Sequence, residues 1–239
     1  MAFPSTINLS YGQEKVETSG KKLKLGTKGV TPDGRVFYYA RNGSAAITTA
    51  GMIVDAGTAL TVAAHDMDVP AAANTAGTVG ITISVPTTDL TKDQYADGYI
   101  IFNDGAGEGE VYRIKSHPAH DASDTNDVVI TIDEPDGIRT ATTTSSLCGF
   151  IVNPYAAVKI IDGDGTMETG ALGVTTIPMT ASYYGWIQTA GVGSVAVGAA
   201  VGVVGDGLQI SQASSESGRA ELYALSGEDD IQSIGTAIG

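Results

Sequence analysis

The chain has 239 residues, with 13 Lys and Arg against 27 Asp and Glu, and a formal net charge of −14. This length suits one large β domain or a core with an inserted module, and so acidic a chain would repel the phosphates of nucleic acid. Only 6 % of the residues are aromatic while Gly occurs 31 times, so little apolar area is available for burial. We therefore expect a homo-oligomer, a trimer rather than a dimer, that completes its core with partner surface.

The sequence shows no export or membrane signal. Its first ten residues, MAFPSTINLS, lack the basic and apolar regions of a signal peptide. The longest apolar tract, residues 192–204, is short and interrupted by Gly and Ser, so it would not span a bilayer. Cys148 is the only cysteine, so it has no intrachain disulfide partner, and we expect it to be a small buried hydrophobe. These features predict synthesis in the cytoplasm and no membrane partner.

Basic residues are concentrated near the start of the chain. Residues 1–41 hold seven Lys and Arg against three acids and carry +4, so the rest of the chain carries −18. Residues 1–30 show little apolar periodicity, and we expect them to form an extended N-terminal arm that becomes ordered on an acidic partner surface. The docking lysines of this arm would be Lys21, Lys22, Lys24 and Lys28. The alternative is a solvated, disordered tail.

A β core is expected from residues 31–68 together with residues 154–239. Residues 35–41 and 51–64 are strand candidates that follow a Pro-Asp-Gly turn. Residues 183–210 alternate in polarity and are interrupted by Gly every few positions, which favours short strands joined by tight turns.

Residues 69–153 have more Asp and longer alternation, and we expect them to form an inserted β module. Its strand candidates are residues 78–85, 99–103, 110–116 and 127–132, with a Gly-rich turn at 104–109. Residues 88–95 favour one helical turn with Thr or Asp at its N-cap. The predicted fold class is all-β: a compact barrel-like or sandwich-like core, an inserted β module and an extended N-terminal arm.

Two segments carry a family resemblance. Residues 25–42, LGTKGVTPDGRVFYYARN, contain the phrase T-x-D-G-R-x-F-x-Y-A, and the later segment YGWIQTAGV precedes a meander of Val, Ala and Gly. Together they cover about a fifth of the chain. Both resemble segments of the head decoration, or capsid cement, proteins of tailed phages.

This resemblance implies a non-enzymatic virion protein on the capsid surface, bound to the major capsid protein where neighbouring capsid subunits meet. It also implies an all-β domain that is often trimeric. Two alternatives remain open: a tail-tube or fibre protein, and a carbohydrate-binding or hydrolytic surface module. An aromatic-lined groove would favour sugar binding, and a pair of acids about 5–9 Å apart would favour hydrolysis.

The partner interface is expected to combine the basic segment with tyrosines and tryptophan, which offer large contact area at low entropy cost. Its candidate residues are Lys21, Lys22, Lys24, Lys28, Arg35, Tyr38, Tyr39, Tyr183, Tyr184 and Trp186. The competing interpretation of the aromatic residues is that they fill the core.

No metal or cofactor is expected. His117 and His120 flank Pro118, which prevents the helical spacing that would align two imidazoles, and no third ligand lies near them in sequence. Residues 162–168 have calcium-loop-like spacing but lack the final bidentate Glu, so a turn is favoured. The acidic residues Asp121, Asp124 and Asp127 are interpreted as a solvated hairpin tip, although carboxylates on an axis between subunits could share a cation.

Catalytic motifs are also lacking. The sequence has no nucleophile elbow, phosphate-binding loop or dinucleotide fingerprint. Glu108 and Glu110 are an acid pair that could in principle perform glycoside hydrolysis. They flank a glycine in a predicted hairpin turn, where acidic side chains are expected to face solvent. We therefore expect no enzymatic activity.

Overall fold

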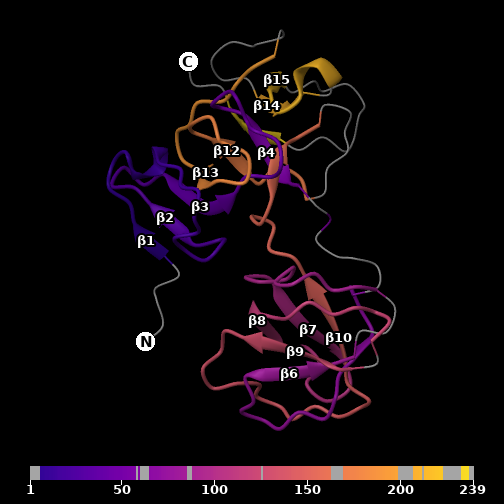
Figure 1. The fold of residues 1–239 in the computed structure, drawn as a ribbon. Helices are drawn as coiled ribbons and strands as arrows, with labels where there is room; N and C mark the ends of the chain where they lie inside the picture. Colours follow the sequence, from indigo (N-terminus) through magenta and orange to yellow (C-terminus); the bar gives the residue numbers. More distant parts are fainter. Residues whose placement is uncertain are drawn as a thin grey trace. The chain divides into compact units, whose positions relative to one another are not determined.

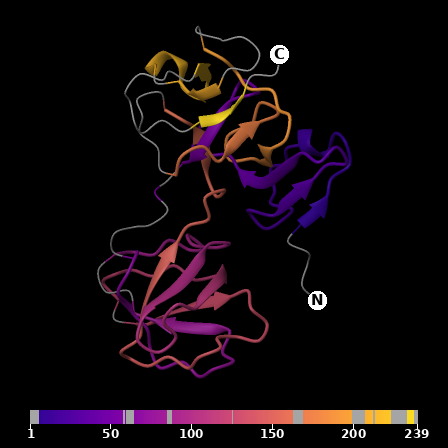
Figure 2. The same cartoon turned by 180° about the vertical axis from the view of Figure 1, so that it is seen from behind.

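The computed structural model describes residues 6–57, 59, 65–84, 88–124, 126–162, 169–198, 207–211, 213–222 and 233–236. These residues form strands β1 to β16 and two short 3₁₀ turns, η1 (Gln13–Lys15) and η2 (Ser214–Glu216). The predicted all-β class is confirmed. The chain divides into two compact units, shown in Figures 1 and 2. Unit 1 comprises residues 1–58 and 154–239, and unit 2 comprises residues 59–153, which begins earlier than the module expected at 69–153.

Unit 1 is built on a seven-stranded sheet in the order β1-β2-β3-β13-β12-β4-β11, in which only β1 and β2 are parallel. In that order the strands are Thr6–Asn8, Lys28–Val30, Val36–Arg41, Tyr184–Ala190, Gly173–Thr175, Ile53–Ala56 and Val158–Ile160. A three-stranded sheet, β15-β14-β16, completes the unit with Ala220–Leu222, Gly207–Ile210 and Ser233–Thr236. Strands distant in sequence therefore lie side by side, as Figure 1 shows.

The large sheet buries side chains on both faces, because successive residues of a strand point to opposite sides. On one face Tyr39 of β3 and Trp186 of β13, which are direct register partners, pack with Leu9, Leu25 and Phe37. The other face carries a larger cluster: Ala40, Ile47, Met52, Val54, Val158, Met179 and Ile187. The β3–β13 pair thus lies between two cores.

The expected extended arm is corrected for residues 6–30, which pack into unit 1. Strand β1 pairs with β2, and Leu9 and Leu25 are buried against Trp186. The carboxylate of Glu17 accepts hydrogen bonds from the backbone and hydroxyl of Thr180, at 2.8 and 2.6 Å. Apolar periodicity missed this packing because the segment is fixed by isolated Leu residues and polar contacts.

Unit 2 is a six-stranded sheet in the order β5-β10-β7-β8-β9-β6, with all its recorded pairs antiparallel. In that order the strands are Val69–Pro70, Leu147–Ile151, Tyr99–Asp104, Val111–Ser116, Val128–Ile132 and Gly80–Ile83. Its core is formed by residues of these strands together with Leu90 and Tyr95, which lie outside them. The largest fully buried side chains are Tyr95, Phe102, Phe150, Ile81, Ile83, Leu90, Ile100, Ile114 and Ile130.

Most of the strands expected in unit 2 are present. The alternating segments at 78–85, 99–103, 110–116 and 127–132 correspond to β6, β7, β8 and β9. In the turn after β7, Gly105, Gly107 and Gly109 have positive φ values of 75°, 92° and 83°. Glycine adopts such values readily because it has no Cβ atom.

Three further expectations concern residues 88–95, Cys148 and the Gly-rich meander. Residues 88–95 form hydrogen-bonded turns instead of a helical turn, with the side chain of Gln94 accepting from the backbone N–H of Thr91 at 3.1 Å. Cys148 is fully buried, as expected. Residues 199–206, within the expected meander, lie outside the described residues.

A close approach at Gly29 tests the packing of the N-terminal segment. A Cβ atom there would lie 2.6 Å from Leu9 Cδ1 and 2.9 Å from Trp186 Cζ3, so we expect Gly29→Ala to lower the free energy of unfolding of unit 1 by about 1–3 kcal/mol. Urea unfolding followed by fluorescence of Trp186, the single Trp, measures this loss. Gly20→Ala is the control, because its Cβ would meet no atom within 4 Å. Equal stability of the two variants would contradict the packing.

Candidate interaction surface

The basic segment at residues 21–28, here called the lysine segment, is held against β3 by hydrogen bonds to one residue. The Tyr39 hydroxyl accepts from the backbone N–H of Lys22 at 3.0 Å. The Tyr39 backbone accepts from Gly26 N–H at 2.8 Å and donates to the Thr27 carbonyl at 3.0 Å. Because Tyr39 is itself only 4 % exposed, the lysine segment is anchored to the core rather than loosely attached.

Tyr39 is fixed by its aromatic neighbours. Its ring stacks on Tyr184 at 6.0 Å and meets Trp186 edge-on at 5.3 Å. Such pairs add about 0.5–1.5 kcal/mol beyond area burial. Tyr39 and Trp186 are buried and Tyr184 is half-buried, so these predicted contact residues pack within the chain.

The two remaining predicted tyrosines are half-buried. Tyr38 stacks on Tyr155 with centroids 5.2 Å apart and planes 2° from parallel. Burial raises the pKa of Tyr155 to about 12, so the Tyr155 hydroxyl stays uncharged at neutral pH. Tyr183 accepts a hydrogen bond from the backbone N–H of Asn42 at 2.8 Å through its carbonyl. The Tyr38 ring therefore has a stacking partner within the chain, whereas the contact of Tyr183 is made by its backbone.

Arg35 makes its contacts within unit 1. Its guanidinium lies 2.8 Å from Asp33 and 3.5 Å from the buried carboxylate of Glu14, and it sits over the Phe37 ring at 5.5 Å. The side-chain hydrogen bond to Asp33 raises the pKa of Arg35, so the group stays charged. Arg35 therefore links the 3₁₀ turn η1 to the start of β3.

The most exposed residues of the predicted interface lie in the lysine segment. Lys21, Lys22 and Lys24 are exposed and Lys28 is half-buried. Of the predicted aromatic residues, Tyr39 is hydrogen-bonded to the lysine segment, and Trp186 packs in the same cluster as Leu25 of that segment.

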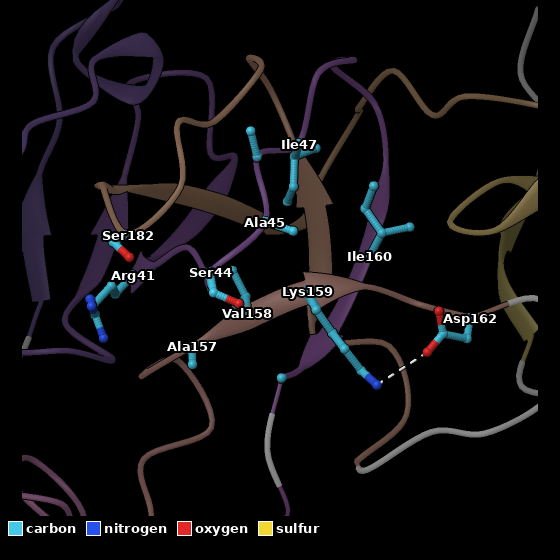
Figure 3. Close-up of a pocket in the computed structure, with 13 residues that line it drawn as sticks. Arg41, Ser44, Ala45, Ile47, Ala157, Val158, Lys159, Ile160, Asp162 and Ser182 are labelled. Atoms are coloured by element: carbon cyan, nitrogen blue, oxygen red, sulfur yellow. Dashed lines mark hydrogen bonds and ion pairs between the residues drawn. The ribbon is translucent and has the colours of Figure 1, made fainter.

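Unit 1 also has an open pocket of about 580 Å³, which was not expected from the sequence. It is lined mainly by Arg41, residues 43–47 and residues 157–160. Figure 3 shows Arg41 and Ser182 on one side, while Lys159 extends toward Asp162, with which it makes a 3.2 Å ion pair. No aromatic side chain lines it. Its two cations point apart, so the pocket offers no converging set of groups.

The other candidate groups have structural partners or lie in solvent. Hydrogen bonds from Thr140, at 2.6 Å, and from Tyr112 go to the carboxylate of Glu110. Burial acts to raise the pKa of Glu110, but these hydrogen bonds outweigh it and lower that pKa. Glu108 is exposed in the turn. This arrangement does not form an acid and base pair.

The three acids expected at a solvated hairpin tip, Asp121, Asp124 and Asp127, are all exposed. Among the described residues no group of three or more His, Cys, Asp or Glu could hold a metal ion. The calcium-like segment at 163–168 lies outside the part of the chain that the structure describes.

Comparison with protein-family models, curated proteins and solved structures finds no match to this chain. Within the described ranges, no helix has the length and apolar character needed to cross a membrane.

Removal of one hydroxyl tests the anchoring of the lysine segment. Tyr39→Phe deletes the acceptor for Lys22 N–H, and we expect a loss of about 0.5–1.5 kcal/mol in stability and faster hydrogen exchange at residues 21–28. Tyr38→Phe is the matched control on the same strand, since no hydrogen bond of its hydroxyl is recorded with the described residues. Hydrogen exchange with mass spectrometry distinguishes them. Equal exchange in both variants would show that the hydroxyl does not anchor the segment.

Proposed function

We propose that this chain is a non-catalytic virion structural protein, a capsid decoration or cement protein that binds the outer capsid lattice and stabilises the head. The observation that carries the proposal is the lysine segment, which is basic, solvent-facing and anchored to a buried aromatic cluster. A surface that is ordered before binding loses less conformational entropy when a partner docks.

Charge supports an acidic partner. The chain as a whole carries −14, yet the lysine segment contains four Lys and no acid. An acidic patch of the major capsid protein would attract this segment and be repelled by the rest of the chain, which fixes orientation. Each contact need contribute little, because a capsid presents many copies of the same site and repeated contacts reinforce the shell.

The two segments that resemble decoration proteins are neighbours in the fold. Residues 25–42 contain β2 and β3, and the YGWIQTAGV segment contains β13, which pairs with β3. Trp186 lies opposite Tyr39, the residue that anchors the lysine segment. The resemblance is thus concentrated on the strands that build the proposed docking surface.

The alternatives receive less support. A sugar-binding module would be favoured by an aromatic groove, but the aromatic residues discussed above stack on one another and the described pocket has none. The hydrolase hypothesis depended on Glu108 and Glu110, and the second carboxylate is engaged by Thr140 and Tyr112. No observation in the described residues favours a tail tube or fibre over a capsid position.

Charge reversal of the lysine segment tests the proposal. We expect the full chain to co-sediment with capsids of the phage that encodes it, and Lys21→Glu with Lys22→Glu to weaken binding about tenfold, more strongly at low salt. The control is Lys92→Glu with Lys115→Glu, an equal charge change at two exposed lysines of unit 2. Equal binding by both double variants would refute the proposed surface, and absence of the chain from purified virions would refute the function.

We also propose that the chain is a homotrimer. Few large hydrophobic residues are available to each copy, so subunit contact would add buried area. Sedimentation equilibrium should give about 73 kDa, three times the 24.4 kDa chain mass. A mass of one chain at high concentration, in the absence of capsids, would contradict a trimer that forms on its own.

A further inference from the structure

Unit 2 buries two histidines around one tyrosine. His65, Tyr95 and His117 are 0 %, 0 % and 3 % exposed. The Tyr95 hydroxyl is hydrogen-bonded to Nδ1 of His65 at 2.9 Å, and the Tyr95 backbone N–H donates to Nε2 of His117 at 3.0 Å. The ring of Phe150, on β10, packs against Tyr95 at 5.2 Å and His65 at 6.4 Å. Four segments distant in sequence therefore meet in one buried cluster.

The hydrogen bonds fix His117 in its neutral form. Because the Tyr95 N–H can only donate, Nε2 of His117 must be an unprotonated acceptor. Its Nδ1 then carries the proton and donates to the Pro118 carbonyl at 2.9 Å. A second proton on Nε2 would set two N–H donors against each other and break the bond to Tyr95.

His65 is buried in the same cluster. Its Nδ1 atom can keep its hydrogen bond to the Tyr95 hydroxyl in either protonation state, because that hydroxyl can donate or accept. Burial still disfavours the charged ring, since the charge would lose its hydration.

We propose that this cluster is an acid-sensitive switch: protonation of His117 breaks its hydrogen bond to the Tyr95 backbone and loosens unit 2, while unit 1 keeps its fold. All three histidines of the chain, His65, His117 and His120, belong to unit 2, so unit 1 has no group that titrates with an ordinary histidine pKa. The switch does not depend on what the chain binds.

Neighbouring titratable groups do not offset this effect. Burial lowers the pKa of His117, and Asp93, whose carboxylate accepts the His117 backbone N–H at 3.0 Å, opposes the shift without reversing it. Burial also lowers the pKa of His65, against the Thr88 backbone and with a contribution from His117. Burial raises the pKa of Tyr95 to about 12, with Asp66 adding to it, and that of Cys148 on β10 to about 12, so both stay neutral.

The sign of the pH dependence follows from these directions. An unfolded histidine has a pKa near 6.5, and the folded values lie below it, so the unfolded chain binds more protons in acid. The stability of unit 2 is therefore complete above about pH 6.5 and falls as the pH drops below that value.

Hydrogen exchange of the full chain tests the switch. Between about pH 7.5 and pH 5, after correction for intrinsic exchange rates, we expect opening of peptides covering residues 88–102 and 147–153 to increase about tenfold or more. Peptides covering β2 and β3 of unit 1 should not change. In His65→Asn with His117→Gln, whose amide oxygens can accept the same hydrogen bonds without titrating, the increase should disappear. In the control His120→Gln it should persist.

An unchanged increase in the double variant, or an equal increase in unit 1, would overturn the proposal. Nitrogen-15 NMR of the unmutated chain supplies a second measurement that needs no folded variant. His117 should show a single proton, on Nδ1, at about pH 6, where an unperturbed imidazole is mostly doubly protonated. A doubly protonated His117 in the folded chain at that pH would equally overturn the proposal.

Discussion

The contact of Trp186 with Tyr39 across strands β13 and β3 is the interaction on which the rest of unit 1 depends. The two rings meet at 5.3 Å on one face of the sheet, while Ala40 and Ile187, their neighbours in sequence, enter the core of the opposite face. Through its hydroxyl and backbone, Tyr39 also fixes the lysine segment. One pair of aromatic residues thus joins both cores and the proposed docking surface.

Acidic and basic side chains near the N-terminus differ in where they lie. Glu14 and Glu17 are used inside unit 1, by Arg35 and Thr180, while the lysines between residues 21 and 28 face solvent or lie near it. The acids of this region therefore hold the chain in place, while Lys21, Lys22 and Lys24 are exposed. The small positive charge of this region is therefore concentrated on residues 21–28.

The sequence predicted local elements well and long-range contacts poorly. Strands β3, β6, β7, β8 and β9 were found because alternation and Gly-rich turns are properties of neighbouring residues. Strand β10, LCGFI, was missed because it buries three consecutive residues and has no alternation. The His65, Tyr95 and His117 cluster was likewise missed, since its members come from separate segments and only the fold brings them together.

The buried thiol of Cys148 is a natural reporter of local opening in unit 2. Its thiol is fully buried on β10, donates weakly to the Val69 carbonyl at 3.4 Å, and has a pKa raised to about 12 by burial. A thiolate-seeking reagent can therefore react only when β10 separates from its neighbours, so the labelling rate measures how often unit 2 opens. Since Trp186 lies in unit 1, the chain carries one natural probe in each unit, and the two can be followed independently in the same sample.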